Sequence, residues 1–200
     1  MKHLVLFSAM SALSFAQQIS TEDRAKVIRY LDQSEKQFRE LIADVNDEQW
    51  KWHPAPGKWS VGEVAEHIVL AEGLLMQSAQ KAIANPPDPE WQTKTKGKTE
   101  FLEKVMVSRM GKATAPEDIV PSGKWTKAET IQRFTEARAK TRQFIETTEV
   151  PLFEHTLEHP FKVFSWLNAY QWTIYIPLHH IRHNGQLGDV KKAEGYPKGA

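Results

Sequence analysis

Apolar residues recur at intervals of three, four and seven positions in four long stretches of this chain. That repeat is typical of a helix with one buried face, so it predicts four amphipathic helices. The predicted helices cover about residues 20–45, 60–84, 127–147 and 164–190. Ser60 with Glu63, and Thr126 with Glu129, have the spacing of capping boxes and predict where the second and third helices begin.

Segments rich in proline, glycine and polar residues separate these helices, and no stretch shows the strict alternation of a strand. A shorter helix is expected at about 101–110. The expected loops are residues 50–57, 85–99, 115–123 and 148–163. Pro177 lies inside the last predicted helix, where a kink is expected. The pattern therefore predicts an all-α fold, a four-helix bundle with an extra short helix, and a site between facing helices.

Composition narrows the class of protein. The chain has 200 residues, of which 40% are hydrophobic and 26% charged, as expected for a single domain with a substantial core. Its net charge is +1 and the two signs are interspersed, which argues against nucleic acid as a partner. It has no cysteine, which excludes disulfides, thiolate metal ligands and a cysteine nucleophile. Any metal site must use His, Asp, Glu or water.

The N-terminus is typical of a secretory signal peptide. Lys2 precedes an apolar run from Leu4 to Phe15, and Ser14 and Ala16 are the small residues that a signal peptidase recognises. A membrane anchor is the alternative, but about 12 apolar residues are too few to span a bilayer, which needs about 20. We therefore expect a signal peptide at residues 1–16, a single domain at 17–200, no stable membrane anchor, and export to the periplasm or the extracellular space.

Three histidines lie on apolar stripes of two predicted helices. His179 and His183 are four residues apart, so their rings lie on one helix face. His67 lies between the apolar residues Val64 and Ala71 at helical spacing. Together the three could bind one divalent metal ion. The alternative is three core histidines without a metal, each of which needs its own hydrogen-bond partner. The stripe of His180 is small or polar, so we expect His180 to face outward or to support the ligands from behind.

Two rival motifs are weaker. The segment from His155 to His159 spells H-x-x-E-H, a zinc peptidase signature that requires a helix, yet it lies between Pro151 and Pro160. We read both histidines as loop residues bordering a cleft. Di-iron bundles need a glutamate three residues before a histidine, and none of the eight histidines has one. Glu63 precedes His67 by four residues, but its capping position already explains it.

The segment Trp59-Ser-Val-Gly-Glu-Val-Ala-Glu-His67, with His179-x-x-x-His183-Asn-Gly-Gln186, resembles the DinB/YfiT-like family of metalloenzymes, the DinB superfamily. The resemblance extends over about residues 20–192. It implies a four-helix bundle that binds a divalent metal through one histidine of the second helix and two of the last, here His67, His179 and His183. It also implies homodimers. Family members include transferases and isomerases that use low-molecular-weight thiols.

These features suggest an exported metal-dependent enzyme, a hydrolase or a thiol-type transferase, that acts on a small-molecule substrate. Zinc and nickel are the first candidates for the metal, with iron, cobalt and manganese also open. Metal-bound water is the expected reactive group, and Gln186, Arg182 and His159 are candidates to support ligands or substrate. The alternative is a non-catalytic bundle that binds a metal or a small ligand. A purely structural role predicts no metal.

Overall fold

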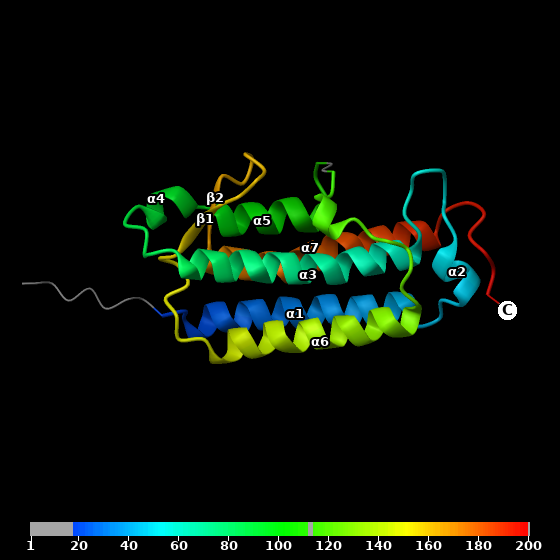
Figure 1. Ribbon diagram of the computed structural model, residues 1–200, viewed down its shortest axis with the longest axis horizontal. Helices are drawn as coiled ribbons and strands as arrows, with labels where there is room; N and C mark the ends of the chain where they lie inside the picture. Colours follow the sequence, from blue (N-terminus) through cyan, green and yellow to red (C-terminus); the bar gives the residue numbers. More distant parts are fainter. Residues whose placement is uncertain (1–17, 112–113, 200) are drawn as a thin grey trace, which may run out of the picture.

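The computed structural model describes residues 18–111 and 114–199, so the expected signal peptide at residues 1–16 lies outside the described residues. Four long helices make up the body of the molecule (Figure 1). They are α1 (Thr21–Ile42), α3 (Val61–Ala84), α6 (Lys127–Thr147) and α7 (Ala169–Lys191). Both α1 and α3 pack against α6 and α7, so each long helix has two long neighbours. The all-α prediction is confirmed, and these helices form the expected bundle.

Two helix starts follow the sequence prediction closely. Ser60 accepts a hydrogen bond from the Glu63 backbone at the start of α3, and Thr126 does the same with Glu129 at the start of α6. The predicted start of the last helix near Phe164 is wrong, because α7 begins at Ala169 after the N-cap Asn168. The residues before it form a short strand instead.

The shorter elements differ more from the prediction. They are α2 (Asp47–Lys51), α4 (Trp91–Thr95), α5 (Lys98–Val107), the 3-10 turn η1 (Glu117–Ile119), β1 (Thr156–Glu158) and β2 (Trp166–Asn168). The expected short helix is α5, shifted a few residues toward the N-terminus. The predicted absence of strands is wrong, because β1 and β2 pair antiparallel. Three-residue strands are too short to produce an alternating pattern, and α2 and α4 are too short to produce a helical one.

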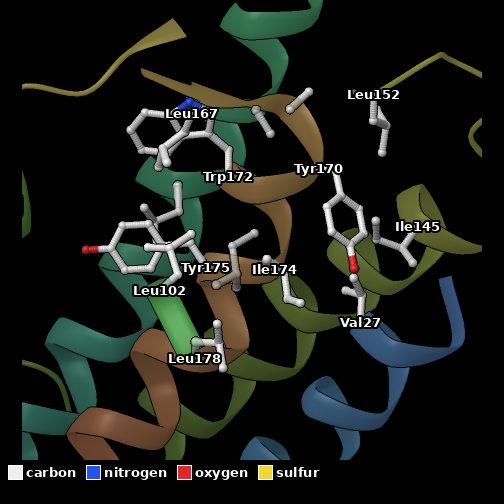
Figure 2. Packing of buried hydrophobic residues seen from close by; sticks show 14 of the residues in the cluster. Val27, Leu102, Ile145, Leu152, Leu167, Tyr170, Trp172, Ile174, Tyr175 and Leu178 are labelled. Atoms are coloured by element: carbon white, nitrogen blue, oxygen red, sulfur yellow. The ribbon is translucent and has the colours of Figure 1, made fainter. Parts of the chain in front are cut away.

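The core consists of two apolar clusters at different levels of the bundle. The larger one surrounds the first half of α7, and Figure 2 shows Tyr170 packed toward Val27 and Ile145 on one side of that helix. On the other side of α7, Trp172 and Tyr175 lie near Leu102 of α5. The second cluster, with Phe38, Ile68, Phe134 and Leu187 among its members, lies toward the end of the bundle where α2 is found.

Between the two apolar clusters lie five buried polar residues, which are spread over the four long helices. We call them the polar layer: Ser34, Glu72, Arg138, His180 and Asn184. Each has at most 3% of its surface exposed. Each of the four long helices, α1, α3, α6 and α7, contributes at least one residue to this layer. Burial of a charged or polar side chain costs free energy unless hydrogen bonds or an opposite charge compensate for the lost water.

Arg138 supplies most of these partners. Its Nε donates to Glu72 Oε1 at 3.2 Å, and its Nη1 donates to the Leu31 carbonyl oxygen at 2.6 Å and to Ser34 Oγ at 3.1 Å. Its Nη2 donates to His180 Nδ1 at 2.6 Å. One side chain of α6 therefore bonds to α1, α3 and α7 at once. Buried ion pairs of this kind cost much to break but add little net stability over a well-packed apolar replacement.

In the part of the chain that the structure describes, none of the helices is both long enough and apolar enough to cross a bilayer.

Replacement of Arg138 tests the polar layer. Arg138→Met leaves the Glu72 carboxylate buried without its cation, so we expect the free energy of unfolding in urea to fall by about 3–5 kcal/mol. The double variant Arg138→Met/Glu72→Leu removes both charges and should recover more than half of that loss. Lys36→Met, which breaks a surface pair with Glu40, is the control and should change little. A loss below about 1 kcal/mol in Arg138→Met would contradict this role.

Candidate metal centre

The structure brings together the three histidines that the sequence singled out. His67 lies in the second turn of α3, and His179 and His183 lie one turn apart in α7, the helix that packs against α3. The ring of His67 is centred 5.2 Å from that of His179 and 4.5 Å from that of His183, and the two α7 rings are 4.3 Å apart. One nitrogen from each ring lies within 4.8 Å of the other two.

Hydrogen bonds fix the tautomers of two rings. His67 Nδ1 lies 2.8 Å from the carbonyl oxygen of Ile119, and His183 Nδ1 lies 2.8 Å from Gln186 Oε1. Both partners are acceptors, so each Nδ1 carries the proton and each Nε2 keeps its lone pair. This is the usual arrangement behind a metal-ligating histidine. Gln186, a candidate supporting residue, therefore contacts the ring of His183.

Burial favours the neutral form of all three rings. Burial lowers the pKa of His67, against the opposing effect of the Ile119 carbonyl. Burial also lowers the pKa of His179 well below its usual value, with further contributions from His183 and His67. The pKa of His183 falls to about 3, again mainly through burial. Neutral imidazole is the form that binds metals, so the site needs little or no proton release to receive a cation.

The group fits a first-row transition metal. A tetrahedral ion with metal–nitrogen bonds of about 2.0–2.1 Å would place its ligand nitrogens about 3.4 Å apart. The three candidate nitrogens all lie within 4.8 Å of one another, which is close to that spacing. The Nδ1 of His179 is buried and has no hydrogen-bond partner among the described residues. That condition fits a ring whose orientation is set by coordination. Three neutral nitrogen donors suit zinc, nickel, cobalt or iron better than magnesium or calcium.

Two aromatic side chains flank the histidines. The Trp59 ring is centred 4.8 Å from His67, and the Tyr175 ring is centred 6.0 Å from His179. Burial raises the pKa of Tyr175, so its phenol stays protonated and can donate a hydrogen bond. Tyr175 was not among the residues predicted from the sequence, although its position one turn before His179 was a usable signal.

The expectation that His180 faces outward is wrong. The alternative, that it supports the ligands from behind, stays a prediction. His180 is fully buried and belongs to the polar layer, on the Arg138 side of α7. An arginine can only donate, so His180 Nδ1 accepts and its proton resides on Nε2, which lies 3.7 Å from Glu72 Oε2. His180 therefore holds α7 in place from within the core.

The remaining candidates lie apart from the three-histidine group. Glu63 Oε2 accepts from the Ser60 backbone N–H at 2.8 Å, as its capping position predicted. The H-x-x-E-H segment includes strand β1 and lacks the helix that a peptidase motif requires. His155 Nδ1 contacts the carbonyl oxygen of Asn85.

His159 is separated from the three-histidine group by the ring of Tyr175. It stacks on Trp172 with ring centres 4.9 Å apart, and its Nδ1 accepts from the Phe161 backbone N–H at 2.9 Å. Its ring centre is 6.0 Å from that of Tyr175, which in turn lies beside His179. His159 can therefore influence the site through Tyr175 and does not touch the three histidines.

Comparisons with known proteins point to one family. The profile of the DinB superfamily matches residues 30–187, which include all three histidines. Among curated proteins, the chain is 25% identical over 152 residues to an uncharacterized protein of Bacillus subtilis strain 168, YuaE. That match covers 76% of this chain and 88% of YuaE. No solved structure matches.

The buried ring of His159 should make stability depend on pH. Burial lowers its pKa to about 4, whereas an unfolded histidine titrates near 6.5, so the unfolded chain binds more protons between these values. The contribution of His159 is complete above about pH 6.5 and is lost as the pH falls toward 4. Between pH 7 and pH 4.5, the metal-free wild type should lose about 2 kcal/mol more unfolding free energy than His159→Phe.

The measurement is urea denaturation at a series of pH values. His53→Phe, at an exposed histidine, is the matched control and should follow the wild type. If the unfolding free energies of the wild type and His159→Phe change with pH in parallel, burial does not lower the pKa of His159 and the prediction is contradicted.

Proposed function

This chain belongs to the DinB superfamily, and from that premise we propose that it is an exported, metal-dependent enzyme acting on a small molecule. The observation that carries the proposal is the convergence of three neutral histidine rings from α3 and α7. A divalent ion on three imidazoles keeps its full charge and an open coordination position, which lowers the pKa of a bound water or thiol. Metal-dependent hydrolysis and metal-dependent thiol transfer both use that chemistry.

The surrounding residues have distinct roles in this proposal. The Ile119 carbonyl and Gln186 hold the Nδ1 protons of His67 and His183, which keeps both Nε2 lone pairs directed away from those partners. Trp59 and Tyr175 cover part of the site and limit access of water. The protonated phenol of Tyr175 is a donor for an oxygen or sulfur atom of a substrate.

One observation favours a non-catalytic, metal-binding bundle as the second candidate. Among the described residues, no carboxylate belongs to the three-histidine group. Glu66, the neighbour of His67, accepts hydrogen bonds from Ser122 and Gly123, and Glu72 pairs with Arg138. Without a side-chain base, an enzyme would depend on the metal to activate its nucleophile.

Metal content tests the shared part of both candidates. Untagged protein reconstituted with zinc or nickel and then desalted should contain about one equivalent of metal by elemental analysis. His67→Ala and His183→Ala should each reduce the metal content to less than about one-tenth of an equivalent, because two histidines hold an ion weakly. His155→Ala, which removes a histidine outside the group, should retain the wild-type metal content. Wild-type protein without metal after reconstitution would contradict both candidates.

Export and dimer formation complete the proposal. The support for export is the N-terminal pattern of one lysine, an apolar run and Ala16. Expression of the full chain in a bacterium should yield, outside the cytoplasm, a protein whose intact mass corresponds to a start at Gln17. Full-length protein in the cytoplasm would contradict export. Light scattering after size exclusion tests the homodimer.

A further inference from the structure

Two arginines lie beside the α7 histidines, and the metal proposal does not use them. Arg182 lies in α7 directly before His183, and Arg109 lies just after the end of α5, the short helix that packs along α7. Burial is the main cause of the low pKa values of His183 and His179. The positive charges of Arg182 and Arg109 add to the lowering of the His183 pKa, and Arg182 adds to that of His179. The positive charge of this pair therefore acts on two of the three candidate ligands.

Arg109 packs against α7 at Gly185, where the lack of a side chain leaves room for the arginine. A Cβ atom at Gly185 would lie 2.9 Å from Arg109 Cδ and 3.1 Å from Arg109 Nη1, so a larger residue there would displace the arginine. Arg109 itself has a φ of 55°, in the left-handed region that few residues other than glycine adopt. Its guanidinium pairs with Asp189, one turn beyond Gly185. The missing side chain at Gly185 and the ion pair with Asp189 together place this arginine beside the helix.

Arg182 has no anionic partner among the described residues. Its guanidinium donates to the carbonyl oxygens of Met110 at 3.1 Å and Gly111 at 2.6 Å, and more weakly to that of Val105 at 3.4 Å. These neutral acceptors hold the group in place without neutralising it. Glu117 and Asp118 in η1 are exposed, and neither pairs with either arginine. Two guanidinium groups and one carboxylate, Asp189, leave an excess of one positive charge.

We propose that this arginine pair binds a carboxylate of the substrate while another part of the substrate reaches the metal. The inference rests on the proposed metal-dependent function and specifies its substrate class. A planar guanidinium matches the two oxygens of a carboxylate. The excess of one positive charge matches a monoanion better than a doubly charged phosphate. The metal ion would add to the same positive field and favour an anionic ligand further.

A matched pair of small thiols tests the inference. The protein is loaded with Co²⁺, and its visible absorption spectrum is followed during titration with 3-mercaptopropionate and with 3-mercaptopropan-1-ol. Both offer sulfur to the metal, but only the first carries a carboxylate at the far end. We expect 3-mercaptopropionate to bind about tenfold more tightly, the order of discrimination that a charge-assisted hydrogen bond supplies.

Variants assign the preference to the two arginines. Arg182→Gln and Arg109→Gln should each reduce the preference at least threefold while leaving the affinity for 3-mercaptopropan-1-ol unchanged. Arg29→Gln, an exposed arginine of α1, makes the same change in net charge and should keep the wild-type preference. Arg182→Lys and Arg109→Lys retain the charge and should retain part of the preference, which guards against a loss caused by misfolding. Cobalt stoichiometry and thermal unfolding are measured for every variant.

The outcomes separate this inference from the proposed function. Equal affinity of cobalt-loaded wild type for the two thiols would overturn the carboxylate site and leave the metal proposal standing. A preference that survives in both glutamine variants would overturn the assignment to Arg109 and Arg182. Failure of the wild type to bind cobalt would overturn the proposed function and this inference together.

Discussion

The arrangement of the bundle depends on one buried ion pair, between Arg138 of α6 and Glu72 of α3. The same guanidinium also bonds to the Leu31 carbonyl in α1 and to His180 in α7, so all four long helices share one charged centre. Apolar contacts alone allow a helix to slide or rotate with modest change in burial. A buried charge allows far less, because every alternative register leaves a group unpaired.

This constraint positions the candidate metal centre. His180 is held by Arg138, which fixes the rotation of α7 about its axis. With α7 in that rotation, His179 and His183 lie on the side that meets His67 of α3. The ligand set therefore follows from the packing of the core, and the hydrogen bonds of Ile119 and Gln186 then set the two ring tautomers. The polar layer and the histidine group occupy neighbouring faces of the same helix and support each other.

The sequence predicted what depends on local patterns. Four helices, the capping boxes at Ser60 and Thr126, and the inward direction of His67, His179 and His183 all followed from spacing. The prediction from sequence failed where one pattern has two possible physical causes, because a polar stripe can face either solvent or a buried polar layer. The stripe of His180 contains Thr173 and Asn184, whose polarity indicated solvent, yet both are buried. Arg109 beside Gly185 could not be foreseen, because that contact depends on how the segment after α5 meets α7.

The proposed activity and the proposed carboxylate site both depend on coordination of a metal by His67, His179 and His183. X-ray absorption spectroscopy of the zinc-loaded protein tests it directly. We predict about three imidazole nitrogens at about 2.0–2.1 Å, with the multiple-scattering features of histidine rings, and one further light atom. His183→Ala should lose one imidazole from that shell. A shell dominated by oxygen, or one that is unchanged in His183→Ala, would contradict the account.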